Sequence, residues 1–289
     1  MFCVACGRKL AIESEGLGCA LRFRNFPTSR RPPLSARKLR QVPAASRNGE
    51  CMSSAAFAAD AAEHDRGSTA QSLAQSGWAL LPKLLSADEC RQVSSLYAQE
   101  AGFRSRVVMA RHGYGRGEYR YLSDPLPGLI QDLRASLYAD LVPIANAWHQ
   151  RLRSEVRFPA THAEFLARCH AAGQTRPTPL LLRYSCGDYN RLHQDLYGEH
   201  VFPLQLAILL SRPLEDFAGG EFLLTEQRPR LQPRAEVVPL TQGDAVVFAV
   251  NSRPVRGTRG EQRVHMRHGV STVRRGHRYT LGIIFHDAQ

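Results

Sequence analysis

The spacing of apolar residues along the chain changes near Pro177. Upstream, apolar positions recur at helical intervals and predict helices over 126–153 and 161–172. Pro143 lies inside the first of these and should bend or divide it, because proline cannot donate the helical hydrogen bond. Another helix is expected to begin near Ser86, since Ser86-Ala-Asp-Glu89 has the spacing of a capping box.

Downstream of Pro177, short runs with alternating inward side chains replace the helical pattern. Turn signals such as Gly219-Gly220 and Gln242-Gly243-Asp244 separate these runs. The predicted strands are 77–81, 179–185, 204–211, 220–225, 235–239, 244–250, 264–270 and 278–285. Helices followed by strands predict an α+β fold, in which N-terminal helices pack on one face of a sandwich, jelly-roll or barrel core.

Composition divides the chain into three regions. Residues 1–51 hold ten Lys or Arg against three Asp or Glu, without sustained periodicity, so a disordered basic tail is expected. Two explanations of this tail stay open: an Arg-rich transit peptide, or a natural start at Met52. Residues 52–176 are expected to form a mainly helical support region and 177–289 the β domain. Because the tail carries most of the net charge of +12, that charge is weak evidence for nucleic-acid binding by the folded part.

Two features bear on the cellular setting. No apolar run approaches the ~20 residues of a spanning helix, and the start Met1–Cys6 is too short for a signal sequence. We therefore expect a cytoplasmic protein with no membrane contact and no obligate protein partner. The seven cysteines lack the spacing of a disulfide framework. Cys3 and Cys6 have zinc-ligand spacing, but free thiols are favoured because no second such pair follows.

The most informative chemical pattern is His193-Gln-Asp195. Residues two apart on a strand point to the same side, so this stretch offers an imidazole and a carboxylate to one metal ion. A later histidine would complete the two-His, one-carboxylate arrangement of non-haem Fe(II) oxygenases. The rival pair, His162 and Glu164, lies in a helical pattern where side chains two apart diverge, so a surface pair is expected there. Taken alone, His193 and Asp195 are more often a chance pair in a polar turn.

Four later histidines can supply the third ligand: His265, His268, His277 and His286. In a site of this type the co-substrate 2-oxoglutarate chelates the iron, and its far carboxylate needs a buried cation, ideally an arginine. His265 and His268 each have an arginine ten residues on. Arg275 lies in a predicted turn, whereas Arg278 lies in a predicted strand with Thr280 on the same face. The pattern therefore favours His268 as the ligand and Arg278 as the anchor.

Two further side chains are candidates for contact with the same carboxylate. Tyr184 shares a strand face with Leu180 and Leu182, so its ring should point into the core, where its hydroxyl needs a partner. That partner is either the 2-oxoglutarate carboxylate or the backbone, and the pattern fits both equally. Thr280 lies beside Arg278 and is the second candidate.

These segments follow an order that resembles the 2-oxoglutarate/Fe(II)-dependent dioxygenase superfamily. The matching segments, in order, are Arg183-Tyr-Ser-Cys-Gly-Asp188, His193-Gln-Asp195, Gly219-Gly-Glu-Phe222, Gly243-Asp-Ala-Val-Val-Phe248, His268-Gly-Val270 and Arg278. The resemblance covers about 177–287 and implies a cupin-like double-stranded β-helix that uses Fe(II), 2-oxoglutarate and O2 to hydroxylate a substrate. His193, Asp195 and His268 would hold the iron, and no protein general base would be required. Arg278 departs from the prolyl 4-hydroxylases, which usually have Lys there.

A finer resemblance, carried by Phe217–Gln227 and the basic loops after it, is to a bacterial oxygenase family named for oxidative repair of methylated nucleic acid. Arginines in 228–234 and 251–263 would suit phosphates, and tyrosines in 114–121 would suit stacked bases. Solvated charge-rich loops and a peptide-binding lid explain the same residues. Three functions stay open: a demethylase of alkylated nucleic acid, a hydroxylase of peptides or small molecules, and a non-catalytic β-helix used for binding. The complete ligand set argues against the third.

Overall fold

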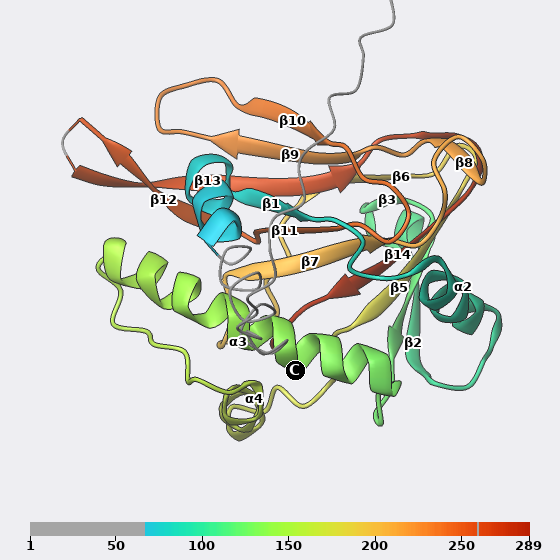
Figure 1. The fold of residues 1–289 in the computed structure, drawn as a ribbon, viewed down its shortest axis with the longest axis horizontal. Coiled ribbons are helices and arrows are strands. Elements are labelled where there is room, and N and C mark those ends of the chain that lie inside the picture. The colour runs from blue at the N-terminus through green and yellow to red at the C-terminus, as the bar shows by residue number, and fades with distance from the viewer. Residues whose placement is uncertain (1–66, 259) are drawn as a thin grey trace, which may run out of the picture. The chain divides into compact units, whose positions relative to one another are not determined.

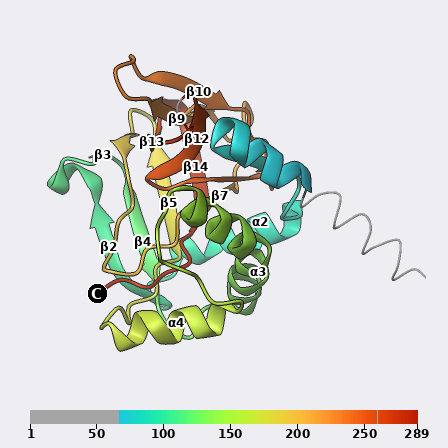
Figure 2. The same ribbon diagram turned by 90° about the vertical axis from the view of Figure 1, so that its left-hand side faces the viewer.

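The computed structural model describes residues 67–258 and 260–289. Within these residues two antiparallel sheets face each other, and helices cover the outer side of the larger one (Figure 1; Figure 2). This is the predicted α+β class with a jelly-roll core. The predicted basic tail and the Cys3–Cys6 pair lie outside the described residues.

The larger sheet has eight strands within the described part of the chain. Its order is β1 (Trp78–Leu81), β11 (Ala245–Ala249), β7 (Leu204–Leu209), β14 (Val273–Ile283), β5 (Leu180–Ser185), β4 (Glu118–Leu122) and β2 (Phe103–Val108), with β8 (Phe217–Gly219) paired to β14. Strand β7 is buried at all of its positions, because one of its faces meets the smaller sheet and the other meets the helices.

The smaller sheet carries the two candidate metal-binding histidines. Its order is β10 (Arg234–Val238), β9 (Phe222–Gln227), β13 (Gly260–Val270), β6 (Tyr189–His193) and β3 (Gly115–Arg116), with β12 (Ser252–Gly257) paired to β13. Phe222 and Leu224 of β9 pack against Val246 and Phe248 of β11, so an apolar layer joins the two sheets. The predicted strands therefore form, with bounds that differ by a few residues.

A helix at 67–76 precedes β1, and three further α-helices pack against the larger sheet. They are α2 (Ala87–Ser95), α3 (Gly128–Arg151) and α4 (His162–Ala171), and the 3-10 turns η1 (Leu96–Ala98) and η2 (Met109–His112) follow α2 and β2. The predicted capping box is confirmed, since the Ser86 side chain accepts from the Glu89 N–H and the Glu89 carboxylate accepts from the Ser86 N–H. Every helix among the described residues is too short or too polar to cross a bilayer.

Helix α3 continues through Pro143, so, of the two predicted effects of this proline, division does not occur, and bending stays a prediction. Pro143 is exposed, and solvent can satisfy the carbonyl that loses its partner. On the buried side, Arg134 donates to the carbonyl oxygens of Ile284 and Phe285 and to Asp287. These bonds hold α3 against the chain just after β14.

The prediction misses β2 and β4, which lie in the segment expected to be mainly helical. Strand β4 alternates the side chains of Tyr119 and Tyr121 with those of Glu118 and Arg120. Tyr119 lines the cavity between the sheets, whereas Arg120 lies over the ring of Tyr97, beside η1. The charged side chains on the outer side of β4 hide the apolar alternation by which a strand is recognised in a sequence. The four strands β1 to β4, which lie within residues 78–122, therefore complete both sheets.

Candidate metal centre

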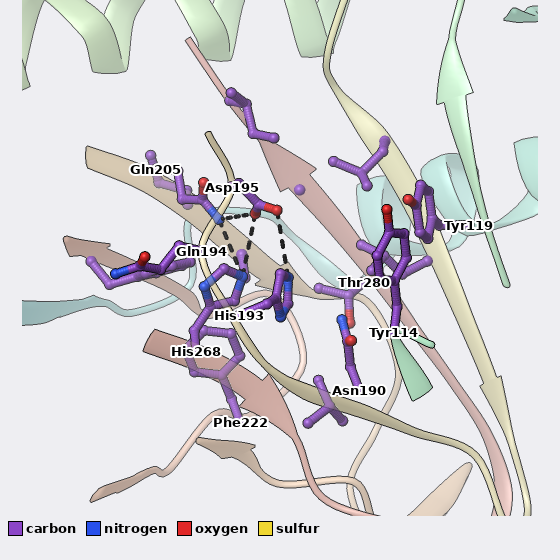
Figure 3. Close-up of a pocket in the computed structure, with 18 of the residues that line it drawn as sticks. Tyr114, Tyr119, Asn190, His193, Gln194, Asp195, Gln205, Phe222, His268 and Thr280 are labelled. Carbon is purple, nitrogen blue, oxygen red and sulfur yellow. Dashed lines mark hydrogen bonds and ion pairs between the residues drawn. The ribbon is translucent and has the colours of Figure 1, made fainter. Parts of the chain in front are cut away.

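Three polar side chains meet between the two sheets (Figure 3). His193 ends β6, His268 is its cross-strand partner on β13, and Asp195 follows β6 by two residues. One possible ligand atom from each lies within 4.8 Å of the others. The Nε2 atoms of His193 and His268 are 3.5 Å and 3.3 Å from different oxygens of the Asp195 carboxylate. The structure thus brings together the three residues that the sequence indicates as metal ligands.

The local backbone conformation brings the three candidate ligands close together. The pairing of β6 with β13 is irregular between His268 and Val270, and a Cβ on Gly269 would lie 2.8 Å from the carbonyl oxygen of Asn190. Glycine therefore permits the close approach of the two strands next to His268. The Nδ1 of His193 lies 2.7 Å from the Arg191 carbonyl oxygen and donates to it, which leaves the lone pair of Nε2 facing Asp195.

The electrostatics of the cluster favour the metal-binding form of Asp195 and His268, whereas at His193 the effect of burial is outweighed by the hydrogen bond and charge of Asp195, which raise its pKa. Burial alone would raise the pKa of Asp195, but its hydrogen bonds and charge interactions with His193 and His268 hold that pKa well below the usual value. Burial, helped by the neighbouring His193, lowers the pKa of His268. The cluster therefore offers an anionic carboxylate and a neutral His268 imidazole, the protonation states that a divalent metal requires.

The other candidate histidines lie elsewhere. His265 is exposed and its Nδ1 is 3.4 Å from the Asn251 side-chain oxygen. His277 is exposed and its Nδ1 contacts the Ser185 hydroxyl. His286 is buried and accepts a hydrogen bond from the Phe202 N–H, and burial lowers its pKa to about 4. None of these three belongs to the cluster found among the described residues.

Two sequence-based expectations near the site are wrong. His162 is buried rather than on the surface, and its Nε2 is 2.8 Å from the carbonyl oxygen of Phe285, although Glu164 does lie at the surface as a helix cap.

Arg253 was expected in an exposed loop but is 1% exposed. It pairs with Glu226 and donates to the carbonyl oxygens of Ala74 and Gln75. It therefore anchors the helix at 67–76 and is not available to a substrate.

Arg278 is a buried cation without a counter-ion. It is 1% exposed, and no carboxylate of the described residues lies within 4.0 Å of it. Its Nη1 donates to the Thr280 hydroxyl at 2.5 Å, while its Nε and the Tyr184 hydroxyl have no hydrogen-bond partner within this part of the protein. Burial lowers the pKa of Arg278 to about 10 and raises that of Tyr184 to about 12. A buried guanidinium without a counter-ion is unfavourable unless an anion binds to it. The far carboxylate of 2-oxoglutarate would be such an anion.

A cavity of about 330 Å³ connects this cation to the cluster. It is lined by the three candidate ligands and by Arg278, Thr280 and Tyr184. Most of the remaining wall is apolar or aromatic, which suits a site that excludes water. Figure 3 places Tyr114 and Tyr119 on the side of the cavity away from Gln205. The arrangement can hold a metal, a small dicarboxylate and part of a larger substrate.

The chain matches the model of a protein family over residues 117–288, which is more than half of its length. That family, Oxygenase-NA, is described as oxygenases catalysing oxidative methylation of damaged DNA. The chain belongs to the Oxygenase-NA family. Two relatives from Mycobacterium tuberculosis, the uncharacterized proteins MT2286 of strain CDC 1551 / Oshkosh and Rv2227 of strain ATCC 25618 / H37Rv, are each 53% identical over 164 residues, or 57% of this chain and 70% of theirs.

A solved structure shares the fold of this Oxygenase-NA protein. A prolyl hydroxylase from Trichoplax adhaerens, in complex with a peptide fragment of the oxygen degradation domain of hypoxia inducible factor, is similar with a TM-score of 0.53 at 16% identity, over 80% of this chain and 93% of that one. A 2OG-Fe(II) oxygenase family oxidoreductase from Burkholderia pseudomallei has a TM-score of 0.45 at 18% identity, over 77% and 92%.

Family, fold and donor set together identify an enzyme. The protein is a 2-oxoglutarate/Fe(II)-dependent oxygenase, and its cofactors are Fe(II), 2-oxoglutarate and O2, as predicted. Two imidazoles and one carboxylate suit Fe(II), and the unpaired Arg278 suits the dicarboxylate. The third hypothesis, a non-catalytic binding protein, is therefore set aside. The predicted cytoplasmic location and the predicted lack of a protein partner stay predictions.

Sequence reasoning missed two residues that bond to Asp195. The Tyr197 hydroxyl donates to one carboxylate oxygen and the Gln205 amide to the other. Tyr197 follows Asp195 at the same spacing that joined His193 to Asp195, so it shares a side with them in an extended segment. Gln205 is the polar residue in the otherwise apolar β7, and a buried amide in such a run needs a partner. Both signals were present in the sequence.

Proposed function

We propose that this oxygenase oxidises N-methyl groups of alkylated nucleic acid. In this proposal His193, Asp195 and His268 hold Fe(II), and Arg278, with Thr280 and Tyr184, binds the far carboxylate of 2-oxoglutarate. Residues 177–289 supply these groups, and the described part of 52–176 supports them with helices and with strands β1 to β4. The observation that supports a nucleic-acid substrate is a rim in which Tyr114 lines the cavity and exposed arginines lie on the same and the neighbouring segment.

This rim is the segment 109–116 with the neighbouring strand β6. Tyr114 lines the cavity, is 49% exposed, and stacks on His112 with ring centroids 5.4 Å apart and an interplanar angle of 23°. Arg111 and Arg191 are exposed, and neither has a carboxylate within 4.0 Å among the described residues. Segment 109–116 contains no acidic residue. A stacking surface beside unpaired arginines suits a base and its flanking phosphates.

Other candidate groups fit less well. Tyr121 is 9% exposed and therefore is not available to stack on a substrate. Arg228 and Arg234 are paired with Glu226 and Glu236. Arg111, His112, Tyr114 and Arg191 form the rim on which the proposal is based, because Tyr114 lines the cavity.

The chain's own residues bind, orient and exclude water. When bound, Fe(II) with 2-oxoglutarate and O2 supplies the oxidation, in which one oxygen atom enters the substrate C–H bond and the other enters succinate as CO2 is lost. A hydroxylated N-methyl group then releases formaldehyde and leaves the N–H of the base. Arg278 fixes one end of the co-substrate, the aromatic wall limits access of water, and Tyr114 orients the substrate. No protein general base is needed.

Succinate release tests the proposal. The enzyme is supplied with a single-stranded oligonucleotide carrying N-methylated bases, with the unmethylated oligonucleotide, with a proline-containing peptide, and with free amino acids. We expect stimulation and formaldehyde release with the methylated oligonucleotide alone. If the peptide or an amino acid stimulates succinate release and the oligonucleotide does not, the nucleic-acid proposal is wrong. The protein would then be a peptide or small-molecule hydroxylase.

Substitutions at the rim sharpen this test. Base stacking on an aromatic ring contributes about 1–3 kcal/mol, so Tyr114→Ala should raise the KM for the oligonucleotide by roughly 5- to 150-fold. Tyr114→Phe keeps the ring and is the matched control, which should remain near the wild-type value. Equal KM values for the two variants would show that Tyr114 does not stack on the substrate.

A further inference from the structure

Asp195 is the candidate ligand that the sheets constrain least. His193 and His268 lie on paired strands, which fix their backbones. Strand β6 ends at His193, and residues 194–200 belong to no helix or strand. A carboxylate on such a segment would sample several rotamers unless other groups hold it, and ordering it on metal binding would then weaken affinity.

Two side chains hold this carboxylate from different directions. The Tyr197 hydroxyl donates to Oδ1 at 2.9 Å, and the Gln205 Nε2 donates to Oδ2 at 2.8 Å. Asp195 and Gln205 are 9% and 4% exposed, so water competes little for these bonds. Because a carboxylate only accepts hydrogen bonds, the amide nitrogen of Gln205 must face it, which fixes the orientation of that amide. Figure 3 shows Gln205 directed at Asp195 beside the two imidazoles.

Both donors are themselves anchored to the larger sheet. Gln205 lies on β7, between Leu204 and Leu206, which are each 1% exposed. The Tyr197 ring packs against the apolar cluster that includes Tyr121 of β4. The histidines belong to the smaller sheet, so the two donors link the third ligand to the opposite sheet.

We propose that Tyr197 and Gln205 are positioning residues that fix Asp195 for metal binding. Together they form a carboxylate clamp, with one donor on each oxygen. Partners of this kind orient ligands in many metal sites, and their loss typically weakens metal binding by about 10- to 100-fold. The clamp rests on the proposed metal centre, but it assigns a task to residues outside the donor set.

The test measures metal affinity directly rather than turnover. Co(II) is titrated into the purified full-length protein and followed by its visible absorption, for wild type, Tyr197→Phe and Gln205→Met. Each variant removes a donor and keeps most of the side-chain volume. We expect the dissociation constant to rise about 10-fold or more in each variant, with an altered Co(II) spectrum, since the carboxylate is free to turn.

Matched controls separate positioning from folding. Tyr138→Phe removes a buried hydroxyl that donates to the Pro159 carbonyl oxygen, and Gln242→Met removes an amide that donates to the Leu210 carbonyl oxygen. Neither residue belongs to the cluster, so both controls should bind Co(II) like wild type. Melting temperatures of the metal-free proteins show whether each variant folds.

The possible outcomes are distinct. Wild-type Co(II) affinity and spectrum in both folded clamp variants would overturn the clamp while leaving the metal centre intact. Failure of the wild type to bind Co(II) would instead overturn the metal centre. If Gln205→Met fails to fold, Tyr197→Phe alone decides, because it loses only a hydroxyl group.

Discussion

Arg278 offers the sharpest prediction about the co-substrate. Its guanidinium is 1% exposed and has no carboxylate within 4.0 Å in the described part of the chain. Replacing it by Met keeps an unbranched apolar stem and removes the guanidinium and its charge. If Arg278 binds 2-oxoglutarate, Arg278→Met should lose affinity for the co-substrate without losing stability in its absence.

The structure sets the size of the expected changes in 2-oxoglutarate affinity and in stability. Removing one partner of a buried, hydrogen-bonded charge pair costs about 2–5 kcal/mol, so the dissociation constant for 2-oxoglutarate should rise from roughly 30-fold to several thousand-fold. Burial lowers the pKa of Arg278 from 12.5 to about 10, a depression equivalent to roughly 3 kcal/mol against the charged form. At neutral pH the guanidinium stays charged, so the protein without co-substrate bears that penalty. Arg278→Met should therefore unfold at the same urea concentration as wild type or at a higher one.

Two measurements check this reasoning. Anaerobic titration calorimetry of the Fe(II)-loaded protein gives the affinity for 2-oxoglutarate, and urea unfolding of the metal-free protein gives the stability. Arg278→Lys, which keeps a charge but loses the planar fork, should fall between wild type and Arg278→Met in affinity. A 2-oxoglutarate affinity within threefold of wild type in Arg278→Met would refute the assignment of Arg278 as the anchor.

Three further predictions follow from the geometry. His193→Ala should abolish Fe(II) binding, so the anaerobic charge-transfer band with 2-oxoglutarate should be absent; a normal band would contradict the ligand assignment. Gly220→Ala should destabilise the protein by about 1–3 kcal/mol in urea unfolding, because Gly220 has a φ of +64° and its Cβ would lie 2.9 Å from Cδ of Arg278; an unchanged midpoint would argue against this strain. Burial lowers the pKa of His162 from 6.5 to about 4, so protons bind the unfolded chain more strongly and stability is lost as pH falls through this window. His162→Gln keeps a donor for Phe285 and should show a weaker pH dependence between pH 6.5 and 4; an identical dependence would show that His162 does not contribute.

The parts of the fold that could be predicted are those whose pattern is local. Strands β7 and β11 are buried along their whole length and, apart from Gln205, apolar, because both of their faces are covered. Strand β4 was missed because its inward residues are tyrosines and its outward residues are charged. Strand β12 was missed because it contains Arg253, whose burial depends on Glu226 and on backbone carbonyls far away in the sequence. No local pattern indicates such a partner.

The candidate site shows the same limit. His193 and Asp195 were found because two residues on one extended segment share a side. His268 was chosen over His265 because the arginine ten residues on, Arg278, lies in a predicted strand; the structure then pairs His268 with His193, 75 positions earlier in the numbering. The role of Gln205 depends on β7 facing the smaller sheet, which the sequence pattern does not specify. The sequence pattern therefore identified the three candidate ligands and Arg278, whereas tertiary packing determined the groups that surround them.

The division of the site between two sheets links its chemistry to the core. The imidazoles of His193 and His268 come from the smaller sheet, whereas Arg278 and Gln205 come from the larger one. The distance between the candidate metal and the co-substrate anchor is therefore set by how the sheets pack. Phe248 of the larger sheet lies with its ring centroid 4.7 Å from that of His268. The apolar layer between the sheets thus fixes the geometry of the site as well as stabilising the fold, since a change in the spacing of the sheets would move the anchor relative to the histidines.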